Sequence, residues 1–400
     1  MIHITDKKNC YACSACVEKC PKRCIILQED KEGFLYPQVN KSICIECGIC
    51  ERVCPIINKG EKQTPLHIYA SINKNDKIRI NSSSGGLFTL LAEEVIKRNG
   101  VVFGACFDEN WEVKHDHIET IEELAILRGS KYMQSRLENN FRKAETFLKQ
   151  GRNVLFSGTP CQIAGLKRYL QKEYENLLTV DFICHGVPSP KIWRIYLKEL
   201  IIRQKKAKNI FFAHPREWKN VIQDIEFRSK STGWKKYSFT LTLSKTVSIE
   251  EKNTVSISSI YEKNIFMRAF LSDLILRPSC YHCHSKEGCS GADITIADFW
   301  GISLYSPSMD DDKGTSLVLL NTDKGIKYYP YNQTTTIEQT LEEATSNNSG
   351  WYTSCHPHPN RKKFFKRVDT GISLEKLVNK MLKPSLFVRV KRRIIYILKL

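Results

Sequence analysis

The chain has 400 residues, of which 42% are apolar and 26% charged, and its formal net charge is +18. This composition is typical of a globular protein with two or three domains and excludes a mainly disordered chain. With no run of about 18 apolar residues and no apolar signal-peptide core near Met1, we expect a cytoplasmic protein without a membrane-spanning helix.

Sixteen cysteines are present, nine of them within residues 10–54. In a chain without an export signal, regular cysteine spacing indicates metal binding rather than disulfides. Two runs have the spacing of bacterial ferredoxins, and each ends in Cys-Pro. In such a pair, the first three cysteines of one run and the fourth of the other hold each [4Fe-4S] cluster. We assign one cluster to Cys10, Cys13, Cys16 and Cys54, and the other to Cys44, Cys47, Cys50 and Cys20.

Cys-x-x-Cys pairs also bind zinc, but two complete runs favour iron–sulfur clusters. We therefore expect a dicluster ferredoxin domain over residues 1–60. Cys24 is left over, and we interpret it as a small buried apolar residue. A polar stretch over residues 58–65 follows and is typical of a linker.

Beyond the linker, strand-like and helix-like patterns alternate. We expect strands at 101–105, 154–157 and 177–183, and a helix at 162–170. Strand, helix and strand within about 30 residues predict a βαβ unit and parallel pairing. Residues 210–260 alternate apolar and polar side chains, which predicts an antiparallel, β-rich insertion.

A small-residue run over 82–86 precedes a helical apolar stripe that starts at Leu87. Backbone N–H groups at a helix start can bind phosphate, although serine there is also a common N-cap. The pattern leaves both interpretations open.

The segment 157–161 lies between a predicted strand and a predicted helix, with Thr159 as the cap and Pro160 at the first helical position. Cys161 then lies at a helix N-terminus, which favours its thiolate. Cys184 follows the next strand, so both cysteines belong to one edge of the sheet. With Cys280 and Cys283 they form either a third cluster site or a scattered set of structural cysteines.

Five segments resemble the family of coenzyme F420 hydrogenase/dehydrogenase β-subunits. With the ferredoxin module, the resemblance covers about residues 1–305. The five segments are residues 84–89, 128–135, 156–162, 181–190 and 292–301.

The resemblance implies an α+β or α/β protein in which the dicluster ferredoxin domain precedes an α/β flavin-binding domain with a β-rich insertion. It implies flavoprotein parts over 66–150 and 151–305, followed by a C-terminal extension over 306–400. The implied cofactors are three [4Fe-4S] clusters and FAD. The implied third-cluster ligands are Cys161, Cys184, Cys280 and Cys283, with Cys289 as a further candidate. The implied flavin contacts are Ser84, Gly85, Gly86, Thr89, Lys131, Tyr132, Gln134, Ser135, Thr159 and Asp298.

Two segments, 184–190 and 298–301, depart from the F420-using members and resemble a bacterial branch associated with surface-polysaccharide biosynthesis. We therefore expect an iron–sulfur flavoprotein oxidoreductase. It would pass electrons from a one-electron donor such as ferredoxin to a small-molecule or glycan-precursor substrate. His185 is the candidate proton donor, unless a local hydrogen bond merely fixes its ring. The alternatives are an F420-dependent oxidoreductase and an electron-transfer subunit without its own substrate.

Residues 360–400 carry 13 basic and two acidic residues. Within them, 381–400 has apolar residues at helical spacing and predicts a basic amphipathic helix. Such a helix either lies on an anionic membrane surface or packs on the protein's own core. The tail lacks a nucleic-acid-reading motif, so we expect no nucleic-acid partner.

Overall fold

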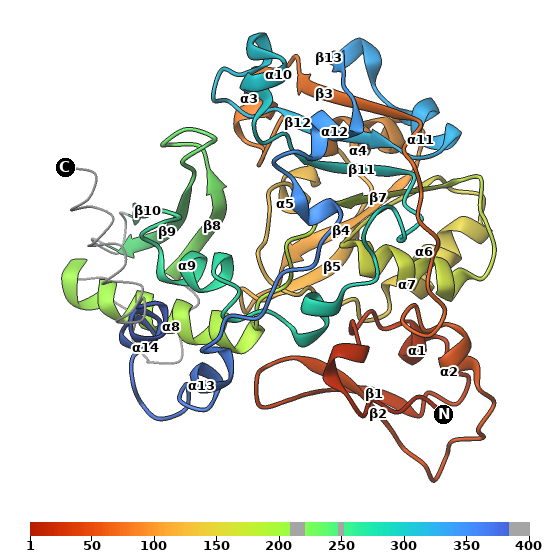
Figure 1. The fold of residues 1–400 in the computed structure, drawn as a ribbon, viewed down its shortest axis with the longest axis horizontal. Coiled ribbons are helices and arrows are strands. Elements are labelled where there is room, and N and C mark those ends of the chain that lie inside the picture. Colours follow the sequence, from red (N-terminus) through yellow and green to blue (C-terminus); the bar gives the residue numbers. More distant parts are fainter. Residues whose placement is uncertain (209–220, 247–251, 384–400) are drawn as a thin grey trace, which may run out of the picture.

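The computed structural model describes residues 1–208, 221–246 and 252–383 (Figure 1). An eight-stranded mixed sheet forms its centre. In sheet order the strands are β13 (Thr334–Glu338), β3 (His67–Asn73), β12 (Ser316–Leu320), β11 (Ile294–Asp298), β7 (Leu177–Phe182), β6 (Val154–Ser157), β4 (Val101–Phe107) and β5 (Val113–Ile118).

The middle of this sheet is parallel, as the sequence predicts. β4 pairs with β6, β6 with β7 and β7 with β11, all in parallel, whereas the outer pairs are antiparallel. The strands expected at 101–105, 154–157 and 177–183 are confirmed as β4, β6 and β7, and the expected helix is confirmed as α7 (Pro160–Leu170). Strands β12 and β13, from the predicted C-terminal extension, pair within the same sheet.

Helices cover both faces of the sheet because its buried strands are apolar on both sides. On one face, α4 (Leu87–Lys97) packs Leu91 and Val95 against Val102 and Leu155. On the other, α7 and α6 (Asn140–Lys149) pack against Phe103 and Phe156. The shorter helices around the sheet are α3 (Asp76–Ile80), α5 (Leu124–Leu127), α10 (Ile302–Tyr305), α11 (Asp323–Tyr328) and α12 (Leu341–Thr345).

The N-terminal unit contains α1 (Ala15–Glu18), a hairpin of β1 (Ile25–Glu29) and β2 (Leu35–Val39), and α2 (Ile49–Arg52). In Figure 1 it lies below α6 and α7. It shares a hydrophobic core with the central domain, because Tyr11, Cys13 and Val53 pack in one cluster with residues of α7.

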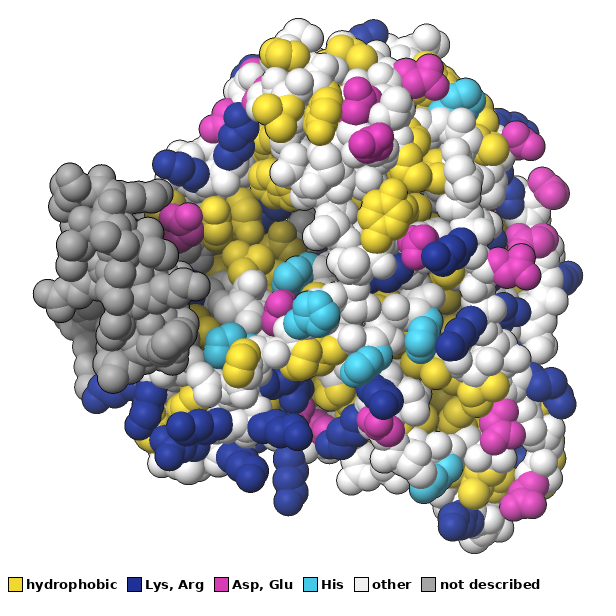
Figure 2. All heavy atoms as spheres, viewed as in Figure 1, with side chains coloured by type: hydrophobic (Ala, Val, Ile, Leu, Met, Phe, Trp, Pro, Cys, Tyr) yellow, Lys and Arg dark blue, Asp and Glu magenta, His cyan; other side chains and the backbone are white. Residues whose placement is uncertain are grey.

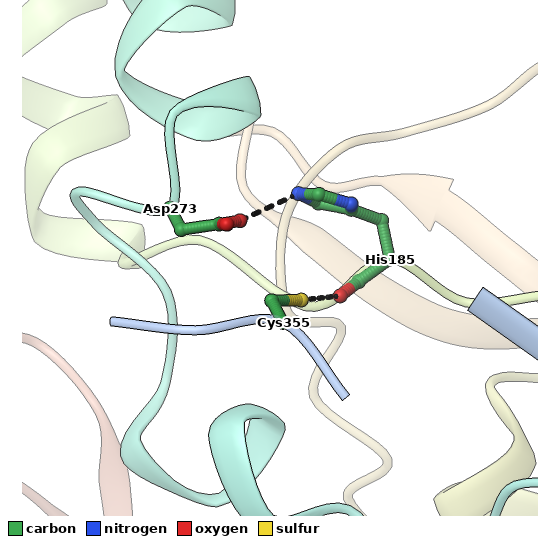
Figure 3. A group of neighbouring side chains, drawn as sticks. All are labelled: His185, Asp273 and Cys355. Carbon is green, nitrogen blue, oxygen red and sulfur yellow. Dashed lines mark hydrogen bonds and ion pairs between the residues drawn. The ribbon is translucent and has the colours of Figure 1, made fainter. Parts of the chain in front are cut away.

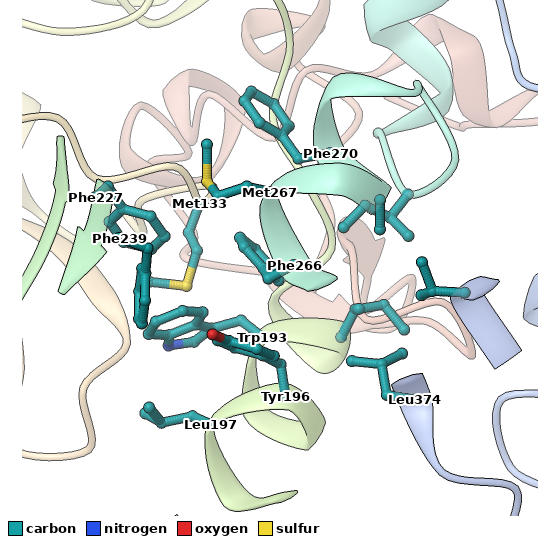
Figure 4. Close-up of a cluster of buried hydrophobic side chains, with 14 of the residues drawn as sticks. Met133, Trp193, Tyr196, Leu197, Phe227, Phe239, Phe266, Met267, Phe270 and Leu374 are labelled. Atoms are coloured by element: carbon teal, nitrogen blue, oxygen red, sulfur yellow. The ribbon is translucent and has the colours of Figure 1, made fainter. Parts of the chain in front are cut away.

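The predicted β-rich insertion is confirmed as a separate antiparallel sheet of β8 (Ile222–Ser229), β9 (Ser238–Thr246) and β10 (Lys252–Ile260). It packs on helices α8 (Pro190–Lys208), α9 (Ile265–Leu271) and α14 (Leu374–Leu382), with α13 (Arg361–Phe365) nearby (Figure 1). The aromatic core between them is shown in Figure 4 and includes Trp193, Tyr196, Phe227, Phe239 and Phe266.

None of the helices in the described ranges is both long and apolar enough to cross a membrane. The amphipathic helix predicted over 381–400 falls almost wholly outside the described residues, which end one residue after α14.

Candidate redox site

The first predicted thiol set comes together beneath α7. Burial raises the pKa of the Cys13 thiol well above its ordinary value, and the nearby thiols of Cys16, Cys54 and Cys10 raise it further. Bound metal ions would reverse this effect, because a coordinating thiol loses its proton. Four converging thiols are the donor set that a [4Fe-4S] cluster needs.

The second predicted set lines a pocket of its own. Cys20, Cys44, Cys47 and Cys50 all border it, and Cys47 is exposed at its rim. Cys24 is buried as predicted, and it also lies beside the second thiol set. Its Sγ lies 3.3 Å from the Sγ of Cys20, and it borders the same pocket.

The two cysteine runs share the same backbone conformation around their second cysteine. In each run, the residues on either side of the second cysteine are left-handed: Ala12 and Ser14 have φ of 53° and 61°, and Glu46 and Gly48 have φ of 52° and 71°. The turn aims amides at the thiols, as when Ala12 N donates to Cys10 Sγ at 3.4 Å. Amide-lined concavities of this kind hold anionic groups such as iron–sulfur clusters.

A third set of thiols meets at the edge of the sheet where the parallel strands end. Cys161, Cys184, Cys280 and Cys283 border one pocket. They come from the start of α7, the end of β7 and a 3-10 helix over Pro278–His282. The fold therefore gathers four cysteines that the sequence left as either a third cluster site or a scattered set.

The structure corrects the expectation that the Cys161 side chain favours its thiolate form. Thr159 caps α7 as predicted, and its backbone N–H donates to Gln162 Oε1 at 3.0 Å. Burial nevertheless raises the pKa of Cys161 to about 12, and the thiol of Cys283 adds to the rise. In the metal-free chain, desolvation and neighbouring thiols outweigh the helix N-terminus.

The first and third thiol sets face each other across α7. Gly165, one turn after Cys161, packs directly on Cys13: a Cβ at this glycine would lie 2.8 Å from the Cys13 Cβ. Arg277, 1% exposed, donates from Nε to the Cys10 carbonyl at 2.9 Å and from Nη1 to Gln134 Oε1 at 3.0 Å. The buried Arg277 thus connects the two sides, and the absence of a side chain at Gly165 allows the two thiol sets to lie close together.

His185 borders the pocket of the third thiol set, and its ring points toward Asp273 (Figure 3). Its Nε2 lies 2.8 Å from Asp273 Oδ1, and its ring meets the Phe270 ring edge-on at 5.1 Å. The Cys355 thiol contacts the backbone carbonyl of His185. The ligating atoms of His185, Asp273 and Cys355 all lie within 4.8 Å of one another.

The predicted flavin contacts fall into two groups. Tyr132 and Asp298 contact Arg228, whose guanidinium pairs with both Asp298 oxygens at 2.7 and 3.0 Å, and Ser84 directly follows a third contact of Arg228, Ser83. Arg228 also donates to Tyr132 Oη at 3.4 Å and to the Ser83 carbonyl at 3.2 Å. The segment before α4 meets residues 128–135, because Ser130 N donates to Ser83 Oγ at 2.7 Å.

The second group lies at the thiol pocket. Gln134, Ser135 and Thr159 border it together with Cys161. Gln162 Nε2 donates to Ser135 Oγ at 2.9 Å, and Gln134 Nε2 donates to the Tyr11 carbonyl at 3.0 Å. The predicted contacts therefore connect the α4 loop on one side with the third thiol set on the other.

The glycines of the α4 loop have a packing role. A Cβ at Gly85 would lie 2.5 Å from the Ser71 carbonyl oxygen and 2.7 Å from Ser316 N. Gly86 has φ of 88° and also packs against Asn73 and Arg79. Close packing and a left-handed turn thus account for both glycines without a phosphate, so neither by itself indicates one.

Two lysines flank this loop. Lys131 Nζ donates to the Arg128 carbonyl at 3.0 Å, and burial lowers the pKa of Lys131 to about 8. Lys230 Nζ donates to the carbonyls of Arg79 and Ser84, both at 2.7 Å, and burial lowers the pKa of Lys230 to about 7. An anionic ligand here would stabilise their charged forms. Thr89 is fully buried and accepts from Arg128 Nε at 3.1 Å.

Sequence reasoning missed several residues of the site. Arg228, Asp273 and Arg277 lie outside the cysteine motifs, and nothing in their local sequence marks them. Cys355 stands alone in the sequence, and only the fold brings it into contact with His185, which borders the pocket of the third thiol set. Gly165 carried a usable signal, since a glycine within a helical pattern suggests close packing. Cys289 lies outside the lining of the third pocket.

Two ferredoxin-like thiol sets and a third set at the edge of an α/β sheet define an iron–sulfur redox protein. Comparison with known families agrees. Residues 9–56 match the 4Fe-4S dicluster domain, and residues 151–343 match the C-terminal domain of the coenzyme F420 hydrogenase/dehydrogenase beta subunit. Residues 151–343 thus carry the C-terminal domain of this family and residues 9–56 carry a dicluster domain, in agreement with the family resemblance seen in the sequence.

Three relatives are similar to parts of the chain. A subunit of the F420H2 dehydrogenase of Methanosarcina mazei is 22% identical over 227 residues, or 52% of this chain and 64% of the relative. Coenzyme F420-dependent sulfite reductase of Methanocaldococcus jannaschii is 27% identical over 205 residues, or 47% of this chain and 30% of the relative. A 7Fe ferredoxin of Hydrogenibacillus schlegelii is 46% identical over 43 residues, or 11% of this chain and 49% of the relative.

The chain thus spans less than two thirds of the length of each of these relatives. Among solved structures, a chain of the F420-reducing [NiFe] hydrogenase complex from Methanosarcina barkeri superposes with a TM-score of 0.42 at 16% identity. That superposition covers 78% of this chain and 95% of the other.

Proposed function

We propose that the protein is an iron–sulfur flavoprotein oxidoreductase with three [4Fe-4S] clusters and one FAD. It would take single electrons from a donor protein and transfer a hydride to a small-molecule or glycan-precursor substrate. The observation that carries the proposal is the convergence of Cys161, Cys184, Cys280 and Cys283 in one pocket beside the Cys13 set. When bound, the clusters supply single electrons and the flavin collects them in pairs.

The chain's own residues would arrange these centres in series. The set that includes the exposed Cys47 would be outermost, and the Cys13 set would lie between it and the third set, because Cys16 is near Cys50 and Cys13 packs on Gly165 of α7. Gly165 removes a side chain from the gap between the inner two sets. Arg277 holds the two sides together and places a positive charge beside both, which favours a centre that gains an electron.

The residues around Arg228 and the α4 loop would hold the flavin. Arg228 and Asp298 form a buried ion pair that fixes Tyr132 and the Ser83 carbonyl. Lys230 contacts the Ser84 carbonyl, and Lys131 lies in the segment that meets the loop through Ser130, so both cations suit a diphosphate. The hollow in the middle of the face shown in Figure 2 is lined largely by hydrophobic side chains, with histidines at its rim, and suits a flat ring system.

His185 would supply the proton that accompanies hydride transfer. Asp273 would orient the ring, since its Oδ1 lies 2.8 Å from Nε2. Asp273 is thus a positioning residue and His185 the proton donor. We place the protein in the cytoplasm, with a role in surface-polysaccharide biosynthesis as the proposed setting and the basic tail as a proposed peripheral membrane contact.

Anaerobic reconstitution followed by rapid mixing with dithionite tests this function. In the wild type, flavin bleaching should follow cluster bleaching. Cys280→Ser/Cys283→Ser should keep the N-terminal clusters reducible while flavin bleaching slows. Cys106→Ser, which alters a buried thiol of β4 outside the three sets, is the matched control. A flavin that bleaches equally fast in both variants would contradict the proposed order, and absence of bound flavin would contradict the function.

A second candidate is an F420-dependent oxidoreductase, and the names of two relatives favour it. Reduced F420 mixed with the holoprotein distinguishes the candidates. Oxidation of F420 with matching flavin reduction would support the second candidate. A third candidate, an electron-transfer subunit, predicts no turnover of any small substrate by the isolated chain.

A further inference from the structure

The surface around the second thiol set differs from the surroundings of the other two sets. Cys47 is exposed there, whereas the thiols of the first set are buried or half-buried and those of the third set are half-buried. Ile45 also borders the Cys47 pocket and is 57% exposed. Ile43 and Ile26, adjacent in sequence to Cys44 and to the pocket-lining Ile25, are 49% and 63% exposed.

Basic residues surround these isoleucines. Lys22 borders the pocket, and Arg23 follows it directly. Arg52 donates from Nη1 to the Cys47 carbonyl at 3.4 Å, and Lys41 follows Asn40, whose N–H donates to the Cys24 carbonyl at 2.8 Å. All four basic side chains are exposed.

The acidic residues of this unit do not offset that charge. Glu29, Asp30 and Glu32 pair with Arg194, Lys7 and Arg361. Asp6 pairs with Lys8, Glu51 pairs with the N-terminal amine, and Glu18 is buried. Glu46 is the exposed acid that borders the pocket. The second thiol set therefore reaches the surface inside an apolar patch with a net positive rim.

We propose that this patch docks an acidic one-electron carrier protein. This inference rests on the proposed function and names the place and the chemistry of its donor. An apolar centre with a charged rim is the usual anatomy of a protein contact, and opposite charge steers encounter and sets its salt dependence. One electron would leave the carrier, which is oxidised, and enter the metal centre held by Cys20, Cys44, Cys47 and Cys50, which is reduced; no bond or proton moves.

Binding and reduction measured on the anaerobic holoprotein test the patch. The two carriers are a bacterial 2[4Fe-4S] ferredoxin and a flavodoxin, which separate two sources of the same acidic chemistry. The test variant is Lys22→Glu/Arg23→Glu. The matched control is Lys77→Glu/Lys327→Glu, which makes the same charge change on α3 and α11, at the other end of the molecule (Figure 1).

We expect the test variant to bind at least one carrier about tenfold more weakly at low salt and to lose most of the salt dependence. The control should bind as the wild type does. Ile45→Ser should speed dissociation and leave the salt dependence unchanged. Dithionite, which needs no docking surface, should reduce all variants equally, so a defect in the clusters cannot be mistaken for a defect in docking.

Three results would overturn the patch while leaving the proposed function intact. The first is equal weakening in the test and control variants, which would mean that only net charge matters. The second is carrier binding that neither variant changes. The third is failure of both carriers to bind a wild-type holoprotein that dithionite reduces normally. Absence of clusters or flavin from that holoprotein would instead contradict the function itself.

Discussion

Gly165 offers a sharp test of how the dicluster unit packs on the central domain. In an ordinary helix, Gly→Ala stabilises by about 1 kcal/mol. Here the new Cβ would lie 2.8 Å from Cys13 Cβ and 2.9 Å from Cys13 Sγ. Because carbon atoms prefer about 3.5–4.0 Å, one side must move by about 1 Å.

Overpacking of this kind costs about 1–3 kcal/mol, so Gly165→Ala should be neutral or destabilising by up to about 2 kcal/mol after the gain in helix propensity. The displaced partner carries a thiol of the first set, so iron should be lost from that set before the others. Anaerobic thermal unfolding by circular dichroism and iron analysis measure both effects. A stabilised Gly165→Ala variant with full iron content would refute the close packing.

Three further predictions concern buried charges. Asp298→Ala leaves Arg228 buried without its partner and should destabilise the fold by about 3–5 kcal/mol. Denaturant unfolding should show that Asp298→Leu/Arg228→Met lowers the free energy of unfolding less than Asp298→Ala does. Equal losses of unfolding free energy in the two variants would argue against the ion pair. Burial raises the pKa of Asp181 to about 7 from an ordinary 3.8, so the folded state retains a proton that the unfolded chain releases. The stability of the folded protein should therefore fall as pH rises from about 4 to 7, by about 1.4 kcal/mol per unit of pKa shift. The melting temperature of Asp181→Asn relative to that of the wild type should rise from pH 5 to pH 8. A constant difference between the two melting temperatures would contradict the shift. Lys131→Gln should lower bound flavin without unfolding the chain, as absorbance and circular dichroism would show, whereas unchanged flavin content would place the phosphates elsewhere.

Local chemistry made the cluster-binding runs predictable. Spacing predicts which thiols of a run turn toward a common centre, because two residues between cysteines leave room for one tight turn. The structure shows that turn twice, in the left-handed pairs at Ala12 and Ser14 and at Glu46 and Gly48. The βαβ core was equally predictable from the sequence, because its strands are short and apolar and include β-branched residues. The antiparallel insertion followed from its alternating pattern.

Long-range contacts could not be predicted in the same way. Arg277 connects residues 10 and 134 through hydrogen bonds that no local pattern encodes. Asp273 and Cys355 reach His185 only after α9 and the chain beyond β13 are in place. The glycines at 85 and 86 show a different limit, because a pattern compatible with phosphate binding also satisfies close packing against β3 and β12.

Iron and acid-labile sulfide analysis of the anaerobically reconstituted protein tests the three-cluster account most directly. The account predicts about 12 iron per chain, four for each thiol set. It also predicts that Cys280→Ser/Cys283→Ser loses about four iron while Cys106→Ser loses none. A wild-type value of about eight iron, unchanged in the Cys280→Ser/Cys283→Ser variant, would remove the third cluster and contradict the account.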